Sequence, residues 1–276
     1  AGALTPVPAG LDTHGNEKEI TMRRMTRIAA VLLFVGGSAL VASAQNVQEG
    51  LVAYWPLNES DGDTAADATG NGHDGTLMGD PEWTGGHFAG GLAFDGVEDE
   101  VVVPYDALLN PETFTVTAWA NVEAGSAGAH RAVLASRDDF PQRGYIFYAE
   151  PGDTWQYWTG VGGGWNVVQG PAVESGDWAH LAGVFADDSQ RFYYNGELAA
   201  ESNAAVSINE AQNFLIGASA NELDPHMFFF VGIIDDVRLY DRELSVDDID
   251  AVMDGEIAAV DVAGKLTTTW GALKGN

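Results

Sequence analysis

The stretch Val231-Gly-Ile-Ile-Asp-Asp-Val-Arg-Leu-Tyr-Asp-Arg-Glu-Leu-Ser245 decides the fold class of this chain. It begins with apolar residues, places two adjacent carboxylates at Asp235 and Asp236, and then alternates apolar with polar residues. A period of two predicts a half-buried β-strand. A carboxylate buried in such a strand is costly unless a cation compensates it. We therefore expect a closing strand of a β-sandwich, with Asp235 turned towards a structural calcium ion. Asp236 should point the other way, to solvent or to Arg238 or Arg242.

The composition indicates a folded and strongly acidic protein. Hydrophobic residues make up 46% of the 276 positions and include eight tryptophans, which is ample for a large core. The formal net charge is −29, from 41 acidic and 12 basic residues, which argues against nucleic acid and anionic membranes as partners. Either solubility in a salty or calcium-containing medium or the binding of cations explains this charge. The chain has no cysteine, so disulfides and thiolate metal sites are excluded.

The N-terminal region has the pattern of a secretory signal peptide. A basic segment at 22–27 precedes the apolar run Ile28–Val35 and a small-residue site that ends at Ala44. We predict a signal peptide over residues 22–44 and an upstream extension over residues 1–21. A membrane anchor is disfavoured because the apolar run is short and interrupted by glycine. The mature chain should begin at Gln45, have no membrane span, and be secreted, periplasmic or on the cell surface.

Short strand patterns fill most of the remaining chain. They recur about every ten to fifteen residues, and only one helix is predicted among them. Phe114–Asn121 alternates with large groups on both faces and should be a central strand, while Asn195-Gly196 predicts a two-residue hairpin turn. We expect an all-β, two-sheet antiparallel jelly-roll sandwich over residues 48–256. The other predicted strands are Leu51–Leu57, Leu92–Gly96, Glu100–Val103, Arg131–Ser136, Gly144–Glu150, Trp155–Gly160, Trp165–Gln169, Trp178–Ala186, Gln190–Tyr194, Phe214–Gly217 and Met227–Tyr240.

One short C-terminal helix is predicted over Ser245–Met253. Ser245 is placed as an N-cap with Asp248 three residues later, and the apolar residues of the segment share one face. Gly255 supplies the stop. The tail at residues 257–276 shows no pattern that assigns it a role.

Several segments together resemble the laminin-G-like, concanavalin A-like jelly-roll domains of secreted bacterial proteins. Each is weak alone, but their order over about 200 residues is specific. The resemblance implies two packed antiparallel sheets, often a structural calcium near the last core strand, and a binding or adhesion role, frequently towards carbohydrate. The segments are Leu51–Asn58, Asp67–Gly75, Ala93–Val101, Phe114–Trp119, Trp178–Gly183, Tyr193–Leu198 and Gly232–Tyr240.

The candidate calcium ligands are Asp67, Asn71, Asp74 and Asp235. The glycine-rich loop Asp67–Gly75 offers two carboxylates, an amide oxygen and accessible carbonyls, which are ligands that calcium accepts. Asp235 would close the site from the last core strand. The alternative is a solvated acidic turn, with Asp235 hydrogen-bonded to backbone.

The candidate ligand-binding residues are Trp155, Tyr157, Trp158 and Trp165, which cluster around the glycine run Gly160–Gly164. Aromatic rings stack on the apolar faces of sugars, so the cluster favours polysaccharide or another glycan as the partner. The alternative for each ring is a place in the core between the sheets.

The predicted function is a secreted, non-catalytic binding module stabilised by calcium. Glycoside hydrolysis needs two carboxylates about 5–10 Å apart, and no strand shows the spacing that would place them. The alternatives are an adhesion or structural module that contacts extracellular protein or matrix and, as a weaker one, an enzyme acting on glycosides.

Overall fold

The computed structural model describes residues 47–125, 130–150, 152–219 and 227–255. All of them belong to the compact unit Ala44–Asn276. The predicted upstream extension (1–21), signal peptide (22–44) and tail (257–276) lie outside the described residues and stay predictions.

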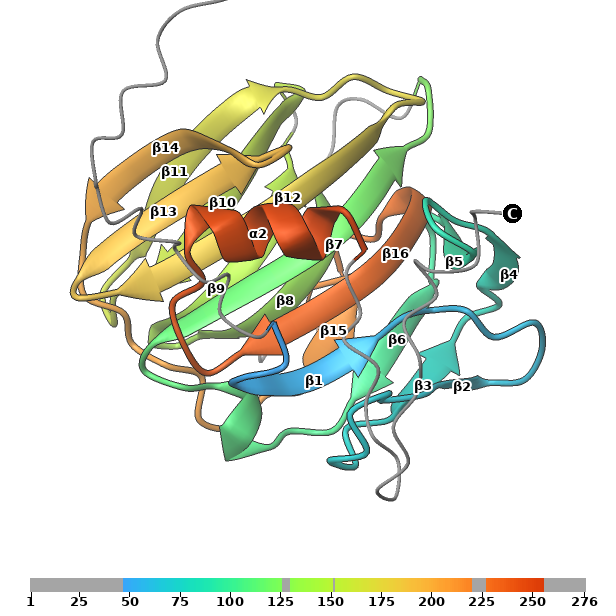
Figure 1. Ribbon diagram of the computed structural model, residues 1–276, viewed down its shortest axis with the longest axis horizontal. Coiled ribbons are helices and arrows are strands. Elements are labelled where there is room, and N and C mark those ends of the chain that lie inside the picture. The colour runs from blue at the N-terminus through green and yellow to red at the C-terminus, as the bar shows by residue number, and fades with distance from the viewer. Residues whose placement is uncertain (1–46, 126–129, 151, 220–226, 256–276) are drawn as a thin grey trace, which may run out of the picture. The chain divides into compact units, whose positions relative to one another are not determined.

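Two antiparallel sheets pack face to face around one apolar core (Figure 1). The first, sheet A, has the order β14-β13-β12-β7-β16-β5-β4, and β1 pairs with the C-terminal half of β16. Its strands are β1 (Leu51–Trp55), β4 (Glu82–Gly85), β5 (Gly90–Asp95), β7 (Phe114–Val122), β12 (Trp178–Ala186), β13 (Ser189–Tyr194), β14 (Glu197–Asn203) and β16 (Val231–Tyr240).

The second, sheet B, has the order β11-β10-β9-β8-β15-β6-β3-β2. Its strands are β2 (Thr64–Ala65), β3 (Gly75–Met78), β6 (Glu100–Val103), β8 (Arg131–Asp139), β9 (Gln142–Ala149), β10 (Thr154–Gly160), β11 (Trp165–Ala172) and β15 (Phe214–Ile216). A single 3-10 turn, η1 (Ala107–Leu109), lies between β6 and β7. The all-β, two-sheet fold class is confirmed.

The core forms because alternate residues of each strand point inwards. On β7, which lies between β12 and β16, Phe114, Val116 and Ala118 are fully buried in the shared core. The opposite face of β7 is also buried, as predicted for a central strand. Asn195 and Gly196 form the β13–β14 turn with φ values of 49° and 81°, as the Asn-Gly pair predicts.

The helix α2 (Val246–Met253) covers the outer face of sheet A (Figure 1). Its start is fixed by a capping box in which the Ser245 side chain accepts from Asp248 N and the Asp248 side chain accepts from Ser245 N. Ile249 and Val252 then pack on apolar side chains of β12 and β13. Within the described residues, no helix covers the outer face of sheet B.

The predicted pairing of Asp236 with Arg238 is confirmed, but the predicted direction of its side chain, opposite to that of Asp235, is wrong. The pairing of β16 with β7 shifts register between Asp235 and Arg238, and Asp236 has a φ of 51°. This β-bulge adds one residue to the strand, so both carboxylates lie on the outer side of sheet A. Asp236 is buried there and forms an ion pair with Arg238.

Candidate functional site

The four aromatic residues predicted to bind ligand divide into two pairs that lie on opposite faces of sheet B. Three of them lie on one strand, β10, whose successive side chains point to opposite faces. Trp155 and Tyr157 point inwards from β10 and are 1% and 0% exposed. Trp158 points outwards, and Trp165 on β11 lies next to it on the same outer face of sheet B. The core alternative therefore holds for Trp155 and Tyr157. Trp158 and Trp165 are partly exposed.

The outer rings belong to a larger cluster, which we call the aromatic face. It consists of His130, Tyr148, Trp158, Trp165 and Phe228. The ring centres of Trp158 and Trp165 are 6.1 Å apart, and those of Tyr148 and Phe228 are 5.6 Å apart. His130 lies 5.0 Å from Tyr148. These contacts join β9, β10 and β11 to the segment before β16, with Tyr148 buried and the rings of Trp158, Trp165 and Phe228 partly exposed around it.

Arg137 of β8 fixes the geometry of the aromatic face from one side. Its guanidinium lies 5.1 Å from the centre of the Trp165 ring and 5.7 Å from that of Phe228. It donates to Tyr148 Oη at 2.8 Å and forms an ion pair with Asp139. Arg137 is only 7% exposed, so its guanidinium is enclosed by the three rings that it contacts and helps to hold them in place.

The polar groups of the aromatic face are neutral or already paired. Burial lowers the pKa of His130 although Glu150 opposes the shift, so the imidazole is uncharged at neutral pH. Burial also raises the pKa of Tyr148. Trp158 Nε1 donates to Gln156 Oε1 at 2.7 Å, which orients the indole. Such a surface can stack against a flat ligand and exchange hydrogen bonds at its rim.

The predicted calcium ligands are not brought together as one site. The Asp67 carboxylate accepts from Tyr54 N at 3.2 Å, Thr69 Oγ1 at 2.7 Å and His73 N at 3.1 Å. Burial would raise the pKa of Asp67, but the hydrogen bonds from Thr69, His73 and Tyr54 outweigh it and lower that pKa. The Asp74 carboxylate accepts from Asp67 N at 2.7 Å. Both carboxylates therefore organise the loop by accepting its backbone donors.

Asp235 lies apart from this loop. The segment that follows Asp67 bonds to β1 through Ala68 N and Tyr54 O, and Asn71 Nδ2 donates to Val52 O. The opposite edge of β1 pairs with β16, so β1 lies between the loop and the strand that carries Asp235. Two ligands of one calcium ion lie at most about 5 Å from each other, whereas the two strand spacings across β1 amount to about 10 Å.

The surroundings of Asp235 supply backbone N–H donors to its carboxylate. Asp235 Oδ2 accepts from Phe88 N at 3.0 Å, and burial raises the pKa of this carboxyl to about 6. A Cβ added to Gly86 would lie 1.7 Å from the Gly90 carbonyl oxygen and 2.6 Å from Asp235 Oδ2, so only glycine fits beside this carboxylate. Among the described residues, no group of three or more His, Asp or Glu side chains is arranged to hold a metal.

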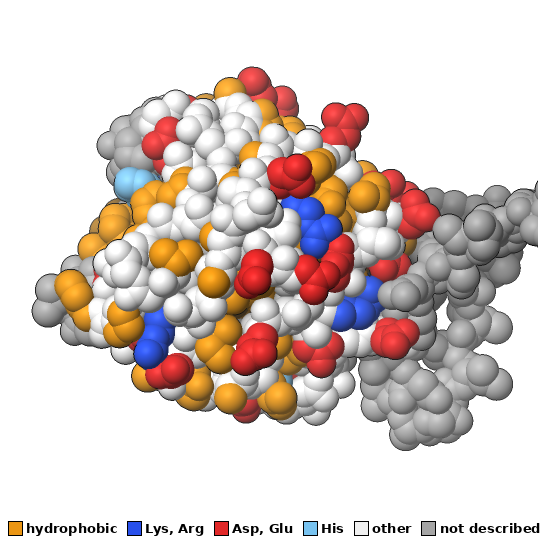
Figure 2. All heavy atoms as spheres, turned by 90° about the vertical axis from the view of Figure 1, so that its left-hand side faces the viewer, with side chains coloured by type: hydrophobic (Ala, Val, Ile, Leu, Met, Phe, Trp, Pro, Cys, Tyr) orange, Lys and Arg blue, Asp and Glu red, His pale blue; other side chains and the backbone are white. Residues whose placement is uncertain are grey.

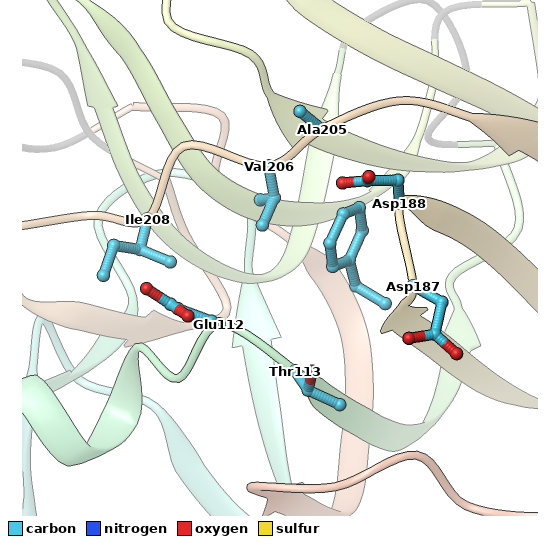
Figure 3. Close-up of a pocket in the computed structure, with 8 residues that line it drawn as sticks. Glu112, Thr113, Asp187, Asp188, Ala205, Val206 and Ile208 are labelled. Carbon is cyan, nitrogen blue, oxygen red and sulfur yellow. The ribbon is translucent and has the colours of Figure 1, made fainter.

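Two pockets lie away from the aromatic face. One, of about 310 Å³, is lined by the apolar side chains of Val206 and Ile208 and by the acidic residues Glu112, Asp187 and Asp188, among others (Figure 3). An acidic lining of this kind suits a cationic group better than a neutral ring. The other, of about 330 Å³, is mostly apolar and is lined by residues of β5, β7 and β16. Sequence reasoning identified neither pocket.

Sequence reasoning also missed His130, Arg137, Tyr148 and Phe228 as parts of the aromatic face. The strand β9 is a run of apolar and aromatic residues buried on both faces, so no alternation in its sequence marks Tyr148 as outward. Phe228 has a φ of 57° and lies outside the strands, so no periodic signal marks it. None of the helices among the described residues is long and apolar enough to cross a membrane.

Two packed antiparallel sheets with one short helix among the described residues define an all-β sandwich class of domain. The family model described as the concanavalin A-like lectin/glucanases superfamily, of the laminin-G type, matches residues 95–250. Since this match covers more than half of the chain, the protein belongs to that family. No curated protein sequence matches the chain.

Several solved structures share the fold. Domain 4 of AbnA, an extracellular arabinanase from Geobacillus stearothermophilus solved in complex with arabinotriose, is 20% identical; the match covers 74% of this chain and 98% of that domain, with a TM-score of 0.57. The binding domain of Paraclostridial Mosquitocidal Protein 1 is 12% identical over 76% of this chain and 53% of its own, with a TM-score of 0.58. Trypanosoma rangeli sialidase is 16% identical over 87% of this chain and 38% of its own, with a TM-score of 0.61. At these identities the similarity establishes the fold alone.

Proposed function

We propose that this protein is a secreted, non-catalytic module that binds glycan through the aromatic face of sheet B. The observation that carries the proposal is the pair Trp158 and Trp165, whose rings lie partly exposed on a sheet that no described helix covers. The fold shared with AbnA domain 4, which was solved with a bound oligosaccharide, supports the same assignment.

The physical basis is stacking on a surface that is already ordered. Tryptophan offers a large apolar area with few rotatable bonds, so little side-chain entropy is lost on binding. Arg137 and Tyr148 hold the surrounding rings before any ligand arrives, which lowers the cost of binding further. Sugar rings present C–H faces to such a surface and hydroxyl groups to the polar atoms at its rim.

Binding is tested by electrophoresis of the full chain through gels that contain single polysaccharides, followed by titration with the best ligand. Trp158→Ala and Trp165→Ala should each weaken binding at least tenfold, because central aromatic residues dominate such interfaces. Leu198→Ala is the matched control, since Leu198 is an exposed apolar residue on β14 of the other sheet, and it should bind as the wild type does.

Two results would contradict the proposal. Variants that bind normally would move the site away from the aromatic face. If no polysaccharide retards the wild-type protein, contact with extracellular protein would remain as the function. Release of reducing sugar from a bound polysaccharide would instead establish an enzyme.

We also propose that calcium stabilises the domain on the Asp235 side rather than at the Asp67 loop. Asp235 is a buried carboxylate, and burial raises its pKa to about 6. A cation there would compensate the burial of its charge. An ion held only by the native state would stabilise it by about 2.7 kcal/mol at a hundred times its dissociation constant.

Removal of calcium with excess chelator should therefore lower the Tm of the wild type by several degrees. Asp67→Asn should remain sensitive to the chelator, whereas Asp235→Asn should not respond. Equal responses of the two variants would contradict this placement, and an unchanged wild-type Tm would contradict calcium binding.

A further inference from the structure

Every arginine in the described part of the chain is paired with a carboxylate. Six arginines and no lysine occur among the described residues. The six ion pairs are Arg131–Asp153, Arg137–Asp139, Arg143–Glu210, Arg191–Glu243, Arg238–Asp236 and Arg242–Asp248. Every arginine of the described residues therefore already has a carboxylate partner when an anionic ligand approaches.

The arrangement is visible on the side of the molecule that carries β11, β13 and β14. Figure 2 shows acidic side chains spread across this side and basic side chains lying beside acidic ones. Because acidic residues outnumber basic ones 41 to 12 in the chain, the field around the protein repels polyanions.

On the aromatic face the pairing is local and structural. Arg137 is the arginine that contacts the rings, and Asp139, two residues later on β8, binds its guanidinium. The remaining contacts of that guanidinium are the neutral hydroxyls of Tyr148 and Ser219, at 2.8 and 3.2 Å. Asp139 therefore cancels a charge that would otherwise be presented directly beneath Trp165.

We propose that the aromatic face selects neutral glycans over acidic ones and that Asp139 determines this specificity by neutralising Arg137. The inference rests on the proposed function of the aromatic face and adds the ligand class to it. A uronate or sulfated sugar would need a free cation beside the stacking surface, as carboxylate and sulfate recognition generally uses arginine. Here that cation is Arg137, which is already paired with Asp139. A neutral sugar therefore binds without needing a charged partner, whereas an acidic sugar finds no free cation to pair with.

The test compares the affinity of the full chain for a neutral polysaccharide with its affinity for polygalacturonate. The neutral probe is the one that binds best among arabinan, xylan and mixed-linkage β-glucan. Salt of about 0.15 M limits the range of the overall charge to roughly 8 Å, so the local pair decides the result. The wild type should bind the neutral probe with higher affinity than polygalacturonate, whose weak binding is measured by titration at high probe concentration.

Asp139→Asn keeps an acceptor oxygen for Arg137 but removes the negative charge. Its affinity for the neutral probe should stay within about twofold of the wild type, while its affinity for polygalacturonate should rise about fivefold. Glu201→Gln is the control, since it changes the net charge equally on an exposed position of β14. It should leave both affinities unchanged.

Asp139→Ser gives a second reading with a smaller side chain and should shift the ratio of the two affinities in the same direction. A wild type that binds both probes equally would overturn the inference while leaving glycan binding intact. So would Asp139 variants that bind the neutral probe but gain nothing towards polygalacturonate. A wild type that binds no glycan at all would overturn the proposed function itself.

Discussion

The outer faces of the two sheets use similar residues for different purposes. On sheet A, α2 and the residues around Phe88 cover the strands, and the Asp236–Arg238 ion pair lies beneath them. On sheet B, rings of comparable size remain partly exposed around Arg137. Aromatic rings and a paired arginine are therefore internal structure on sheet A, whereas on sheet B the described residues leave part of the rings exposed.

The covered face shows how completely such groups can be used within the fold. Arg238 contacts both oxygens of Asp236, at 2.6 and 3.0 Å, and its guanidinium lies 4.6 Å from the Tyr54 ring centre. The ring of Trp119 is stacked under His87 at 3.5 Å and is only 7% exposed. Little of this surface is left for a ligand, whereas Trp158 and Trp165 keep theirs.

The largest loss of stability is expected when the buried ion pair of sheet A is broken. Arg238→Ala should destabilise the protein by about 3–5 kcal/mol, because it leaves the Asp236 charge buried without its partner. Chemical denaturation measures this change. Arg191→Ala breaks the more exposed pair with Glu243 and should cost at most about 1 kcal/mol.

Asp236→Asn combined with Arg238→Met should recover much of the loss, since neither side chain then carries a charge. An Arg238→Ala variant no less stable than Arg191→Ala would mean that the covered face contributes little to stability.

A smaller effect is expected from the buried histidine of sheet A. Burial lowers the pKa of His180 to about 3, and Arg238 and His87 add to the shift. The unfolded chain binds a proton below about pH 6.5 and the native state does not, so stability falls as the pH drops. Between pH 7.5 and pH 5 the loss should be about 2 kcal/mol.

The loss is measured as the difference in unfolding free energy between wild type and His180→Gln at each pH. His130→Gln on sheet B is the control, because His130 is partly exposed and should change the pH dependence less. A pH dependence unaltered by His180→Gln would show that His180 is protonated in the native state or exposed to solvent.

Much of the fold was predictable because its signals are local. The alternation of Phe114–Asn121, the Asn195-Gly196 turn and the capping box at Ser245 each depend on neighbouring residues, and the structure has all three. The strands that were missed, β2, β3, β4 and β14, are short, glycine-bearing or largely exposed, so their periodicity is weak.

The site was harder to predict because it depends on which face of the sheet each strand residue lies on and on contacts between residues that are far apart in the sequence. The sequence places Trp155, Tyr157 and Trp158 together, but the period of two sends the first two into the core and the third outwards. The direction of Asp236 failed for a related reason, since one bulge residue reverses the phase of a strand. The partners of Trp158, such as Tyr148 and Phe228, are brought close only by the tertiary fold.

The central claim is that ligand binds to the open face of sheet B and not to the covered face of sheet A. The most direct test follows the indole N–H signals of the eight tryptophans by NMR while the best neutral oligosaccharide is added to ¹⁵N-labelled protein. The signals of Trp158 and Trp165, assigned with Trp→Phe variants, should shift in a saturable way, while those of Trp119 and Trp155 should not. Saturable shifts at Trp119 without shifts at Trp158 and Trp165 would contradict the account.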